Sequence, residues 1–460
     1  MVLLINPPHS IADGNIWKNI DRALPPLGLA CIAAYLEQKG EQVKILDLQV
    51  EHLDFFLFRE FLRSLRPEYI GISATTVEIE AAFTLARLAK DILHQSKIIL
   101  GGVHASILPE EALMRPDVDF VIRQEGEITL HELVNAKPLA TIAGLSYKEG
   151  AMCRHNADRA FIENLDAMPL PAYHLLPMKK YRPSLGNYKR LPASSMVTAR
   201  GCPGRCTFCY TGILGKKIRA RSAQSLLEEV KLLQKDYGIR EISFYDDTFT
   251  ALRVNVLDFC ERIVKEKIDI SWSCMSRIDF VDSEVLSMMR RAGCHQIGYG
   301  IESSNCRILE QIGKRIELGQ AEKAVKLTQA AGIDVRVMFM LGNPGETEGS
   351  MRQTIRFAAG LNADVAIFNI TTPYPGTEMY EWASSRGYLA QLEWNKFDLS
   401  HVVMNLPTVS AEKIYQCYRQ AYKTFYFRLP YIARRFLKIR SFNDIKNNVR
   451  SFFSVLAFDS

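Results

Sequence analysis

Short apolar runs alternate with amphipathic stretches through the first part of this sequence, and this rhythm restricts the possible folds more than any other feature. The predicted strands are 2–5, 43–46, 69–73, 97–100 and 120–123, and the predicted helices are 27–39 and 81–93. Strands that are apolar throughout and separated by helices are typical of a parallel, doubly wound α/β sheet. Such Rossmann-like sheets bind ligands beyond the carboxyl ends of their strands. We therefore expect a ligand-binding domain over residues 1–135.

The rhythm resumes with a longer period after residue 190. The predicted strands are 195–198, 241–245, 272–275, 296–301, 335–341 and 365–370, with helices such as 223–237 and 255–267 between them. Six such units predict a partial, TIM-like (β/α)6 barrel over residues 191–380, with its chemistry at the carboxyl ends of the strands. Prolines punctuate residues 136–190, which we expect to form a linker with a small hairpin around 142–147 and a turn at Gly144. Residues 381–460 are predicted to be a mostly helical extension.

Composition indicates an ordinary soluble protein of more than one domain. The chain has 460 residues, 48% of them hydrophobic and 23% charged, with a net charge of +6. That charge is too small for the length to indicate a nucleic-acid partner. No apolar run approaches the roughly 20 residues that span a bilayer, and the N-terminus lacks the pattern of a secretory signal. We expect a cytoplasmic protein.

Three of the ten cysteines lie within eight residues, in the pattern C-x3-C-x2-C formed by Cys202, Cys206 and Cys209. Three thiolates on one tight loop can each bind one iron of a cubane cluster, and Gly201 and Gly204 permit the backbone angles that such a loop needs. Three ligands leave one iron open, as a catalytic site requires. The alternatives are chance and a zinc site, although no nearby histidine or cysteine would complete a tetrahedron. The other seven cysteines are scattered singly and are interpreted as buried, reduced thiols.

In this context the cysteine loop resembles that of the radical S-adenosylmethionine (SAM) superfamily, in which the open iron of a 4Fe-4S cluster binds SAM. The resemblance continues along the predicted barrel. It implies that Phe208 lies against the adenine, that Asp246 and Asp247 face the SAM amine, and that Arg277 pairs with the SAM carboxylate. The usual Gly-Gly-Glu is replaced here by the two aspartates. A surface salt bridge is the alternative for Arg277.

Two further strand ends carry the same resemblance. Glu302 and Ser303 follow the fourth strand of the predicted barrel, where the resemblance implies that Glu302 contacts the ribose hydroxyls. Gly342 opens Gly-Asn-Pro-Gly-Glu-Thr after the fifth strand, where a small residue lets the backbone approach the adenosine. A turn without a binding role is the alternative there.

The first domain resembles the cobalamin-binding domain that precedes the barrel in one large radical SAM subclass. The matching segments are Asn-Pro-Pro at 6–8, Pro-Pro-Leu-Gly-Leu at 25–29, Gly-Ile-Ser-Ala-Thr at 71–75, Gly-Gly-Val-His-Ala at 101–105 and Glu-Gly-Glu at 125–127. The residues expected to bind cobalamin are Ser73, Thr75, Gly101, Gly102 and His104. The D-x-H-x-x-G motif that ligates cobalt in cobalamin mutases is missing, so we expect no histidine on the lower face of the cobalt. His9 and His104 are candidates for loop or tail contacts. A cofactor-free module that docks a partner is the alternative for this domain.

The last part of the chain is basic and rich in aromatic residues. Residues 421–450 hold eight lysines and arginines and a single acidic residue, with phenylalanines and tyrosines between them. This pattern is typical of a helix that rests on a membrane surface or binds an anionic or lipid-like substrate. The alternative is a solvated helix that covers the barrel.

The resemblance implies that the reduced cluster cleaves SAM to a 5′-deoxyadenosyl radical, which takes hydrogen from an unactivated carbon. In the commonest outcome for the subclass, the substrate radical takes a methyl group from methylcobalamin. A second SAM molecule then methylates the cobalt again. An electron donor of the flavodoxin or ferredoxin type is implied. We expect C-methylation of a small-molecule or lipid-like substrate, with oxidative cyclisation or rearrangement as the runner-up. A cobalamin-binding sensor or carrier without turnover is the alternative outside catalysis. Methylthiotransferases that act on transfer RNA carry three further cysteines in their first domain, and this chain lacks them.

Overall fold

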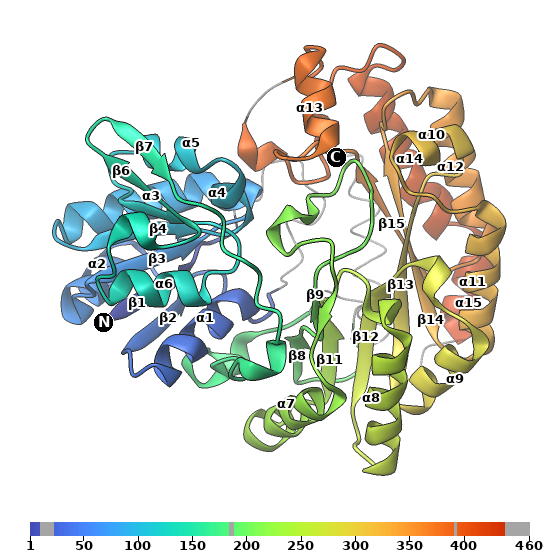
Figure 1. Cartoon of the computed structure of the whole chain (residues 1–460). Coiled ribbons are helices and arrows are strands. Elements are labelled where there is room, and N and C mark those ends of the chain that lie inside the picture. Colours follow the sequence, from blue (N-terminus) through green and yellow to red (C-terminus); the bar gives the residue numbers. More distant parts are fainter. Residues whose placement is uncertain (10–22, 184–187, 391–392, 438–460) are drawn as a thin grey trace.

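The computed structural model describes residues 1–9, 23–183, 188–390 and 393–437. Within them, a mainly parallel sheet and a fully parallel one form the two halves of the molecule, with the N-terminal sheet on the left of Figure 1 and the barrel on the right. None of the described helices is both long enough and apolar enough to cross a membrane.

The N-terminal sheet has the strand order β2-β1-β3-β4-β5-β6-β7. Its strands are β1 (Val2–Asn6), β2 (Val43–Asp47), β3 (Tyr69–Ser73), β4 (Lys97–Gly101), β5 (Phe120–Ile122), β6 (Leu145–Glu149) and β7 (Met152–His155). The first five are parallel, and β6 and β7 add to the edge as an antiparallel hairpin. The expected doubly wound sheet is confirmed. The hairpin turns at Gly150 rather than Gly144, and it belongs to this sheet rather than to the linker.

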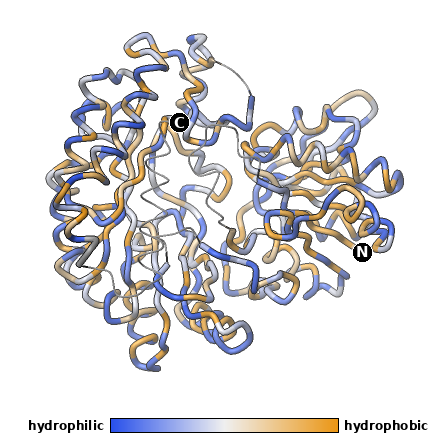
Figure 2. The backbone as a smooth tube through the Cα atoms, turned by 180° about the vertical axis from the view of Figure 1, so that it is seen from behind, coloured by the Kyte–Doolittle hydropathy of each residue, from blue (hydrophilic) through white to orange (hydrophobic). Residues whose placement is uncertain are grey.

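Helices cover both faces of this sheet because its strands are apolar on both sides. One face packs against α1 (Leu27–Gln38) and α6 (Glu127–Val134). The other packs against α2 (Phe55–Leu65), α3 (Ile79–Ile92) and α5 (Pro109–Met114), and α4 (Val103–Ile107) follows β4. In Figure 2 the strands of this half are mostly orange, and the outer turns of its helices carry much of the blue.

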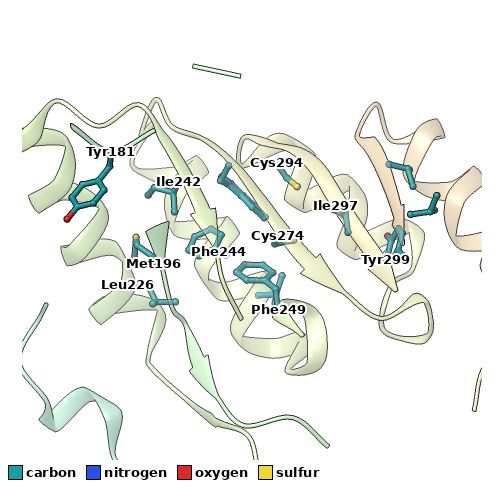
Figure 3. Close-up of a cluster of buried hydrophobic side chains, with 14 of the residues drawn as sticks. Tyr181, Met196, Leu226, Ile242, Phe244, Phe249, Cys274, Cys294, Ile297 and Tyr299 are labelled. Carbon is teal, nitrogen blue, oxygen red and sulfur yellow. The ribbon is translucent and has the colours of Figure 1, made fainter. Parts of the chain in front are cut away.

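The second sheet has six parallel strands in the order β15-β14-β13-β12-β11-β8. They are β8 (Ala193–Met196), β11 (Glu241–Phe244), β12 (Ser271–Ser276), β13 (Cys294–Glu302), β14 (Asp334–Leu341) and β15 (Val365–Ile370). The connecting helices are α7 (Ala223–Tyr237), α8 (Arg253–Lys265), α9 (Ser283–Arg291), α10 (Cys306–Gln311), α11 (Leu318–Ala330) and α12 (Glu348–Gly360). The predicted partial barrel is confirmed. Figure 3 shows part of its core, in which Met196, Phe244 and Cys274 extend from neighbouring strands.

The two halves share buried packing at two places. The segment between the sheets joins α1 to the barrel, because Tyr173 and Tyr181 belong to the same apolar core as Met196 and α1. Tyr181 also donates a hydrogen bond of 2.8 Å to Asp47 at the end of β2. After the barrel, Trp394 and Phe397 pack into the core on the other face of the N-terminal sheet. The chain therefore returns to its first half after completing the barrel.

The C-terminal extension closes the open edge of the barrel. It contains α13 (Glu378–Ser385), α14 (Ala411–Tyr426) and α15 (Leu429–Leu437). The Tyr422 hydroxyl accepts a hydrogen bond from the Phe368 amide and donates one to the Phe368 carbonyl, at 3.2 and 2.9 Å. The Tyr426 hydroxyl does the same at Ala366, at 3.2 and 2.8 Å. These contacts satisfy backbone groups of the edge strand β15, which would otherwise be open to another strand.

This packing corrects the interpretation of the aromatic residues in the extension. Phe425 and Tyr431 are buried against the barrel, so they are not available to a membrane surface. The alternative expectation, a helix that covers the barrel, is correct for this stretch. The basic residues from 438 to 450 lie outside the described residues.

Candidate active site at the cysteine loop

The cysteine loop leaves the barrel after β8 and is braced by a short hairpin made of β9 (Ala199–Arg200) and β10 (Arg219–Ala220). Gly201 has a φ of +99°, and a Cβ atom there would lie 2.3 Å from the Lys217 carbonyl. Only glycine tolerates both conditions. The Cys202 amide donates a hydrogen bond of 3.2 Å to the Gly215 carbonyl. The start of the loop is thus held tightly against the chain that returns to β10.

The donor set fits an iron–sulfur cluster. All three cysteines are free thiols, and Cys209 is exposed. A Cβ atom placed on Gly204 would lie 3.3 Å from the Cys202 sulfur and 4.0 Å from the Cys206 sulfur, so both thiols border the same small space. Burial raises the pKa of Cys206, and binding of iron would displace its proton. Among the described residues, no three His, Cys, Asp or Glu side chains are grouped to hold one metal ion, whereas a cubane takes each thiolate on a separate iron.

Phe208 lies in a small apolar group beside the loop. Its ring packs against Ile308, Leu309 and Met379. Two backbone hydrogen bonds fix the chain next to it, from the Thr207 amide to the Ile312 carbonyl and from the Met379 amide to the Thr207 carbonyl, at 3.0 and 2.9 Å. The ring is only partly buried, so one part of its surface remains for a ligand.

The two aspartates at the end of β11 have different environments. Asp246 is buried, and its Oδ1 accepts hydrogen bonds from the Thr198 amide, the Thr198 hydroxyl and the Ala199 amide, at 2.8, 3.0 and 2.6 Å. It therefore ties β11 to the strand that leads into the cysteine loop. Its Oδ2 is buried without a partner among the described residues, and burial raises the pKa of this carboxyl to about 6. Asp247 is exposed, and its charge acts on Cys209.

Two cationic side chains, Arg277 and Lys314, lie beside the cysteines. Only Arg277 was predicted from the sequence. Arg277 forms a two-pronged pair with Asp279, at 2.9 Å for both contacts. Lys314, which is 7% exposed, lies 2.9 Å from Glu302. Burial by itself would lower the pKa of Lys314, but the negative charges of Glu302 and of Cys206 as a thiolate outweigh it and raise the pKa. Lys314 follows the short helix α10 without a periodic pattern or motif, so no sequence signal marked it.

Glu302 is also unusual in its backbone. Its φ is +72°, in the left-handed region that non-glycine residues rarely adopt, at the point where the pairing of β13 and β14 shifts register. Such strain often accompanies a binding role. A side chain on Gly300 would collide with the Glu302 carboxyl and reach the Lys314 amine, at 2.3 and 3.0 Å. The ion pair of Glu302 and Lys314 thus occupies the space that a side chain at position 300 would need.

Ser303 and Gly342 are engaged inside the protein. The Ser303 hydroxyl accepts a hydrogen bond of 3.1 Å from the Asn305 amide and lies 3.4 Å from the Thr354 hydroxyl. Gly342, with a φ of +83°, donates its amide to Glu346 at 2.8 Å and packs against Ile414 of α14. These contacts support the turns around the site.

The carboxyl edge of the N-terminal sheet is built for close packing of loops. Gly102 has a φ of +88°, and a Cβ atom there would lie 2.6 Å from the Ala74 carbonyl and 2.9 Å from the Ser73 hydroxyl. The Ala74 amide bonds to the Gly101 carbonyl at 3.1 Å, so the ends of β3 and β4 meet. Thr75 is exposed, and its hydroxyl donates a hydrogen bond of 2.8 Å to Glu78. This edge offers backbone and hydroxyl groups, which suits a large polar cofactor tail.

A polar network that the sequence did not reveal extends along the same edge. The Asn6 side chain donates a hydrogen bond of 2.8 Å to Asp47, and the Gln49 side chain donates one of 3.0 Å to Glu78. His9 Nδ1 also lies 3.0 Å from Glu78. These residues come from the ends of β1, β2 and β3, so their proximity follows from strand order rather than from any local motif.

His104 is placed differently from the expectation. Its ring is buried in an edge-to-face contact with Trp394, with centroids 5.1 Å apart, and its Nε2 lies 3.6 Å from Glu111. Glu111 in turn accepts a hydrogen bond of 2.9 Å from the Trp394 indole. His104 thus joins the N-terminal half to the segment after the barrel, and no part of its ring is open to a cofactor.

Comparisons with known proteins agree with this arrangement. Residues 196–358 match the radical SAM superfamily, and residues 17–134 match the B12 binding domain. The chain is 38% identical over 433 residues, covering 93% of this chain and 92% of the relative, to an uncharacterized methyltransferase, PH0819, of Pyrococcus horikoshii. It is 24% identical to the anaerobic magnesium-protoporphyrin IX monomethyl ester cyclase of Rubrivivax gelatinosus, covering 95% and 79% of the two chains.

A solved structure shares the fold. The radical SAM methyltransferase TsrM from Kitasatospora setae, with cobalamin and a [4Fe-4S] cluster bound, superposes with a TM-score of 0.69 at 18% identity, over 85% of this chain and 75% of that chain. The cofactors of the family are a 4Fe-4S cluster, SAM and cobalamin. From its two matching domains and its relative of nearly equal length, the chain belongs to the cobalamin-binding radical SAM family.

Proposed function

We propose that this chain is a cobalamin-dependent radical SAM methyltransferase that acts on an unactivated carbon of a small-molecule or lipid-like substrate. The observation that carries the proposal is the three-thiol loop, whose donor set leaves one iron open, on the same chain as a B12 binding domain. The bound cofactors supply radical formation and methyl transfer, while the protein orients the reactants and excludes water. Similarity to an uncharacterized methyltransferase over 93% of the chain supports the proposal.

In this proposal Cys202, Cys206 and Cys209 hold three irons of the cluster. The remaining polar residues of the barrel hold SAM. Glu302 is suited to the ribose hydroxyls, because an ionised carboxylate accepts strong hydrogen bonds. Asp247, which is exposed near Cys209, is suited to the SAM amine.

The positive charge beside the cluster matches the SAM carboxylate. Arg277 and Lys314 both act electrostatically on Cys206. We assign the carboxylate to one or both of them, since a guanidinium fork or an ammonium group can bind it. Phe208 keeps part of its ring surface for the adenine. Asp246 uses its Oδ1 to hold the loop in place, and its Oδ2, which has no partner among the described residues, would remain for SAM.

Cobalamin is assigned to the carboxyl edge of the N-terminal sheet. Ser73 and Thr75 would offer hydroxyl groups there, and Gly101 would let the cofactor approach the backbone. Gly102 would act by letting the ends of β3 and β4 meet, because the space beside it is filled by Ala74 and Ser73. The polar network of Asn6, Asp47, Gln49 and Glu78 borders the same edge. The proposal thus assigns cobalamin binding to residues 1–135, and the cluster and SAM to residues 191–380.

Reduction of the cluster requires an external one-electron donor. We assign this role to a protein of the flavodoxin or ferredoxin type, which would reach the cluster from the side of the exposed Cys209. An oxygen-sensitive cluster and ten cysteines, of which none forms a disulfide in the described structure, suit a reducing cytoplasm.

A second candidate function is oxidative cyclisation, which is favoured by the similarity to the Rubrivivax cyclase over 95% of the chain. Both functions begin with the same cleavage of SAM, and only one adds carbon to the substrate.

An isotope experiment separates the two. The anaerobically reconstituted enzyme is incubated with a metabolite extract of its source organism, dithionite and SAM that carries a trideuterated methyl group. Methyl transfer predicts a new extract component with the label, and the label is missing when Cys209→Ala protein is used. Label-free products that have lost hydrogen would favour cyclisation and contradict methyl transfer.

A further inference from the structure

Four charged side chains, three of them buried and one partly buried, join the cobalamin edge of the N-terminal sheet to the base of the cysteine loop. Arg200 donates to Glu125 at 2.6 Å and to Glu127 at 2.7 Å. Arg219 donates to both oxygens of Glu125, at 2.8 and 3.1 Å. Glu125 and Glu127 each expose 4% of their side chains, Arg219 exposes 2%, and Arg200 exposes 15%. We call these residues the four-charge junction.

The two acids of the junction belong to the N-terminal half. Glu125 lies in the loop after β5, and Glu127 begins α6, so both lie at the carboxyl edge that carries Gly102. The preceding residue, Gln124, donates its amide to Ser106 of the segment after β4 at 2.9 Å. The acids are therefore continuous with the edge assigned to cobalamin.

The two arginines belong to the hairpin that braces the cysteine loop. Arg200 and Arg219 are directly paired in β9 and β10, and Arg200 is two residues before Cys202. Figure 1 shows β9 between the two halves of the molecule. Because Gly201 is clamped against the Lys217 carbonyl, a shift of Arg200 would move the first cysteine as well.

Backbone contacts complete the junction. The Ile162 amide donates to Glu125 at 2.7 Å, and Arg219 donates to the Ile162 and Leu214 carbonyls at 2.7 and 2.8 Å. Two positive and two negative charges balance, and Glu125 and Arg219 each also bond to the backbone. Buried ion pairs contribute little net stability compared with apolar packing, but a guanidinium fork between two fixed carboxylates specifies one relative orientation.

We propose that the four-charge junction sets the distance and orientation between the cobalamin edge and the iron–sulfur loop, and so couples methyl transfer to radical formation. The inference rests on the proposed function, because it requires both cofactors on one chain. Glu125, Glu127, Arg200 and Arg219 are positioning residues: they act through the loop and the edge that they hold. Misplacement of reacting groups by about 1 Å can lower catalysis about 100-fold, so such control has a measurable effect.

Two variants test the junction. Glu127→Gln removes one charge and keeps the shape, and Arg200→Lys keeps the charge but cannot span both carboxylates. The matched control is Glu163→Gln, because Glu163 pairs with Lys217 of the same loop at 2.6 Å but exposes 65% of its side chain. All proteins are reconstituted without oxygen with iron, sulfide and hydroxocobalamin, and their iron, sulfide and cobalamin contents are measured first.

The decisive readout is the magnetic coupling between the reduced cluster and cob(II)alamin, measured by pulsed electron paramagnetic resonance. The wild type and the Glu163→Gln control are expected to give the same narrow distance distribution, and both junction variants a shifted or broadened one. With SAM and dithionite, the ratio of S-adenosylhomocysteine to 5′-deoxyadenosine is expected to fall about tenfold in the variants and to stay within about twofold in the control.

Three other outcomes have distinct meanings. Variants that hold both cofactors and keep the wild-type distances and product ratio would overturn the positioning role. Variants that lose their fold or a cofactor would also overturn it, since the junction would then be a structural support. A wild-type protein that binds only one of the two cofactors, or shows no coupling between them, would contradict the proposed function itself.

Discussion

The cysteine loop and the cobalamin edge are two sites at the carboxyl ends of parallel strands, and they are built in opposite ways. The loop concentrates its chemistry in three side chains within eight residues. The edge spreads its groups over the ends of four strands and offers mainly backbone, hydroxyl groups and a glycine that no other residue could replace. Iron requires particular side chains, whereas a bulky cofactor tail requires space. The first demand leaves a compact sequence motif, whereas the second leaves residues scattered over several strand ends.

Removal of a cluster ligand should have the largest effect. Cys206→Ala should reduce 5′-deoxyadenosine formation to the level of cluster-free protein, because the cluster would lose one of its three anchors. The cobalamin content should stay within about twofold of the wild type, since the cobalamin edge belongs to the other sheet. The measurement is a set of iron, cobalamin and product assays on the same preparation.

Cys306→Ala is the matched control, because Cys306 is an exposed free thiol at the start of α10. Equal loss of SAM cleavage in the two variants would show that cysteine removal in general, rather than the loss of a cluster ligand, disturbs the enzyme.

A carboxyl group in a barrel turn and one at the cobalamin edge should respond in opposite directions to pH. Burial raises the pKa of Glu346, behind the barrel turn at Gly342, from 4.5 to about 7. The folded state thus binds this proton more tightly than the unfolded state. Its contribution to stability is fully present below pH 4.5 and is lost as the pH rises through 7, by about 3 kcal/mol in total.

Urea unfolding of wild type and Glu346→Gln between pH 4.5 and 8 measures this loss as a difference between the two proteins. Parallel stability curves would contradict the predicted role of Glu346.

At the cobalamin edge, burial would raise the pKa of Glu78, but hydrogen bonds and charge from His9 and Thr75 outweigh the effect of burial and lower the pKa. The contribution of Glu78 should therefore be present above its ordinary pKa and fade as the pH falls.

A side chain at Gly102 should damage the cobalamin edge selectively. Gly102→Ala places a Cβ atom 2.6 Å from the Ala74 carbonyl at a φ that disfavours alanine, so β3 and β4 must separate. We expect cobalamin retention to fall about tenfold, which corresponds to about 1.4 kcal/mol. The cluster content should not change.

Gly319→Ala in α11 is the control, because its Cβ atom would meet nothing within 4 Å and the residue lies outside the cobalamin-binding domain. If Gly102→Ala keeps full cobalamin, the edge assigned here is not the binding site. If it loses the cluster as well, the two sites are less independent than their separate sheets indicate.

The smallest predicted change concerns SAM affinity. Glu302→Gln keeps an acceptor for Lys314 but removes the charge, so hydrogen bonds to the ribose should weaken. A charged hydrogen bond contributes more than a neutral one, and a loss of about 1 kcal/mol should raise the SAM dissociation constant about fivefold. Equilibrium titration of the reconstituted protein with SAM measures it, with the exposed Glu310→Gln as the control. Unchanged affinity would remove Glu302 from the SAM site.

The sequence predicted the sheets well and the tertiary contacts poorly. Segments 69–73 and 365–370 were predicted with the bounds that the structure has, because mainly apolar runs give way to polar residues there. The helix Phe55–Leu65 was missed: its first turn exposes Phe55, Phe56 and Leu57, which obscures the usual apolar stripe. The hairpin was placed one glycine too early, since Gly144 and Gly150 both have positive φ and only the second forms the turn.

At the site, too, the sequence predicted the local motif but not the tertiary contacts. A motif located the cysteine loop, but Lys314 and the partners of Arg200 could not be found, because Glu125 and Glu127 are 75 and 73 residues away along the chain. From the sequence, Asp246 and Asp247 were also assigned the same expected role. In the structure Asp246 turns inward to hold the loop, while Asp247 faces outward. Side-chain direction at a strand end depends on the turn that follows, which the pattern of residue types does not encode.

The most direct test of the account is cleavage of SAM by the reconstituted two-cofactor protein. Wild type and Cys206→Ala are purified without oxygen, loaded with iron, sulfide and hydroxocobalamin, and incubated with SAM and dithionite, and 5′-deoxyadenosine and S-adenosylhomocysteine are followed by chromatography. The account predicts both products from wild type and loss of 5′-deoxyadenosine in the variant. Neither product from a wild-type protein that holds an intact cluster, binds cobalamin and binds SAM would contradict it.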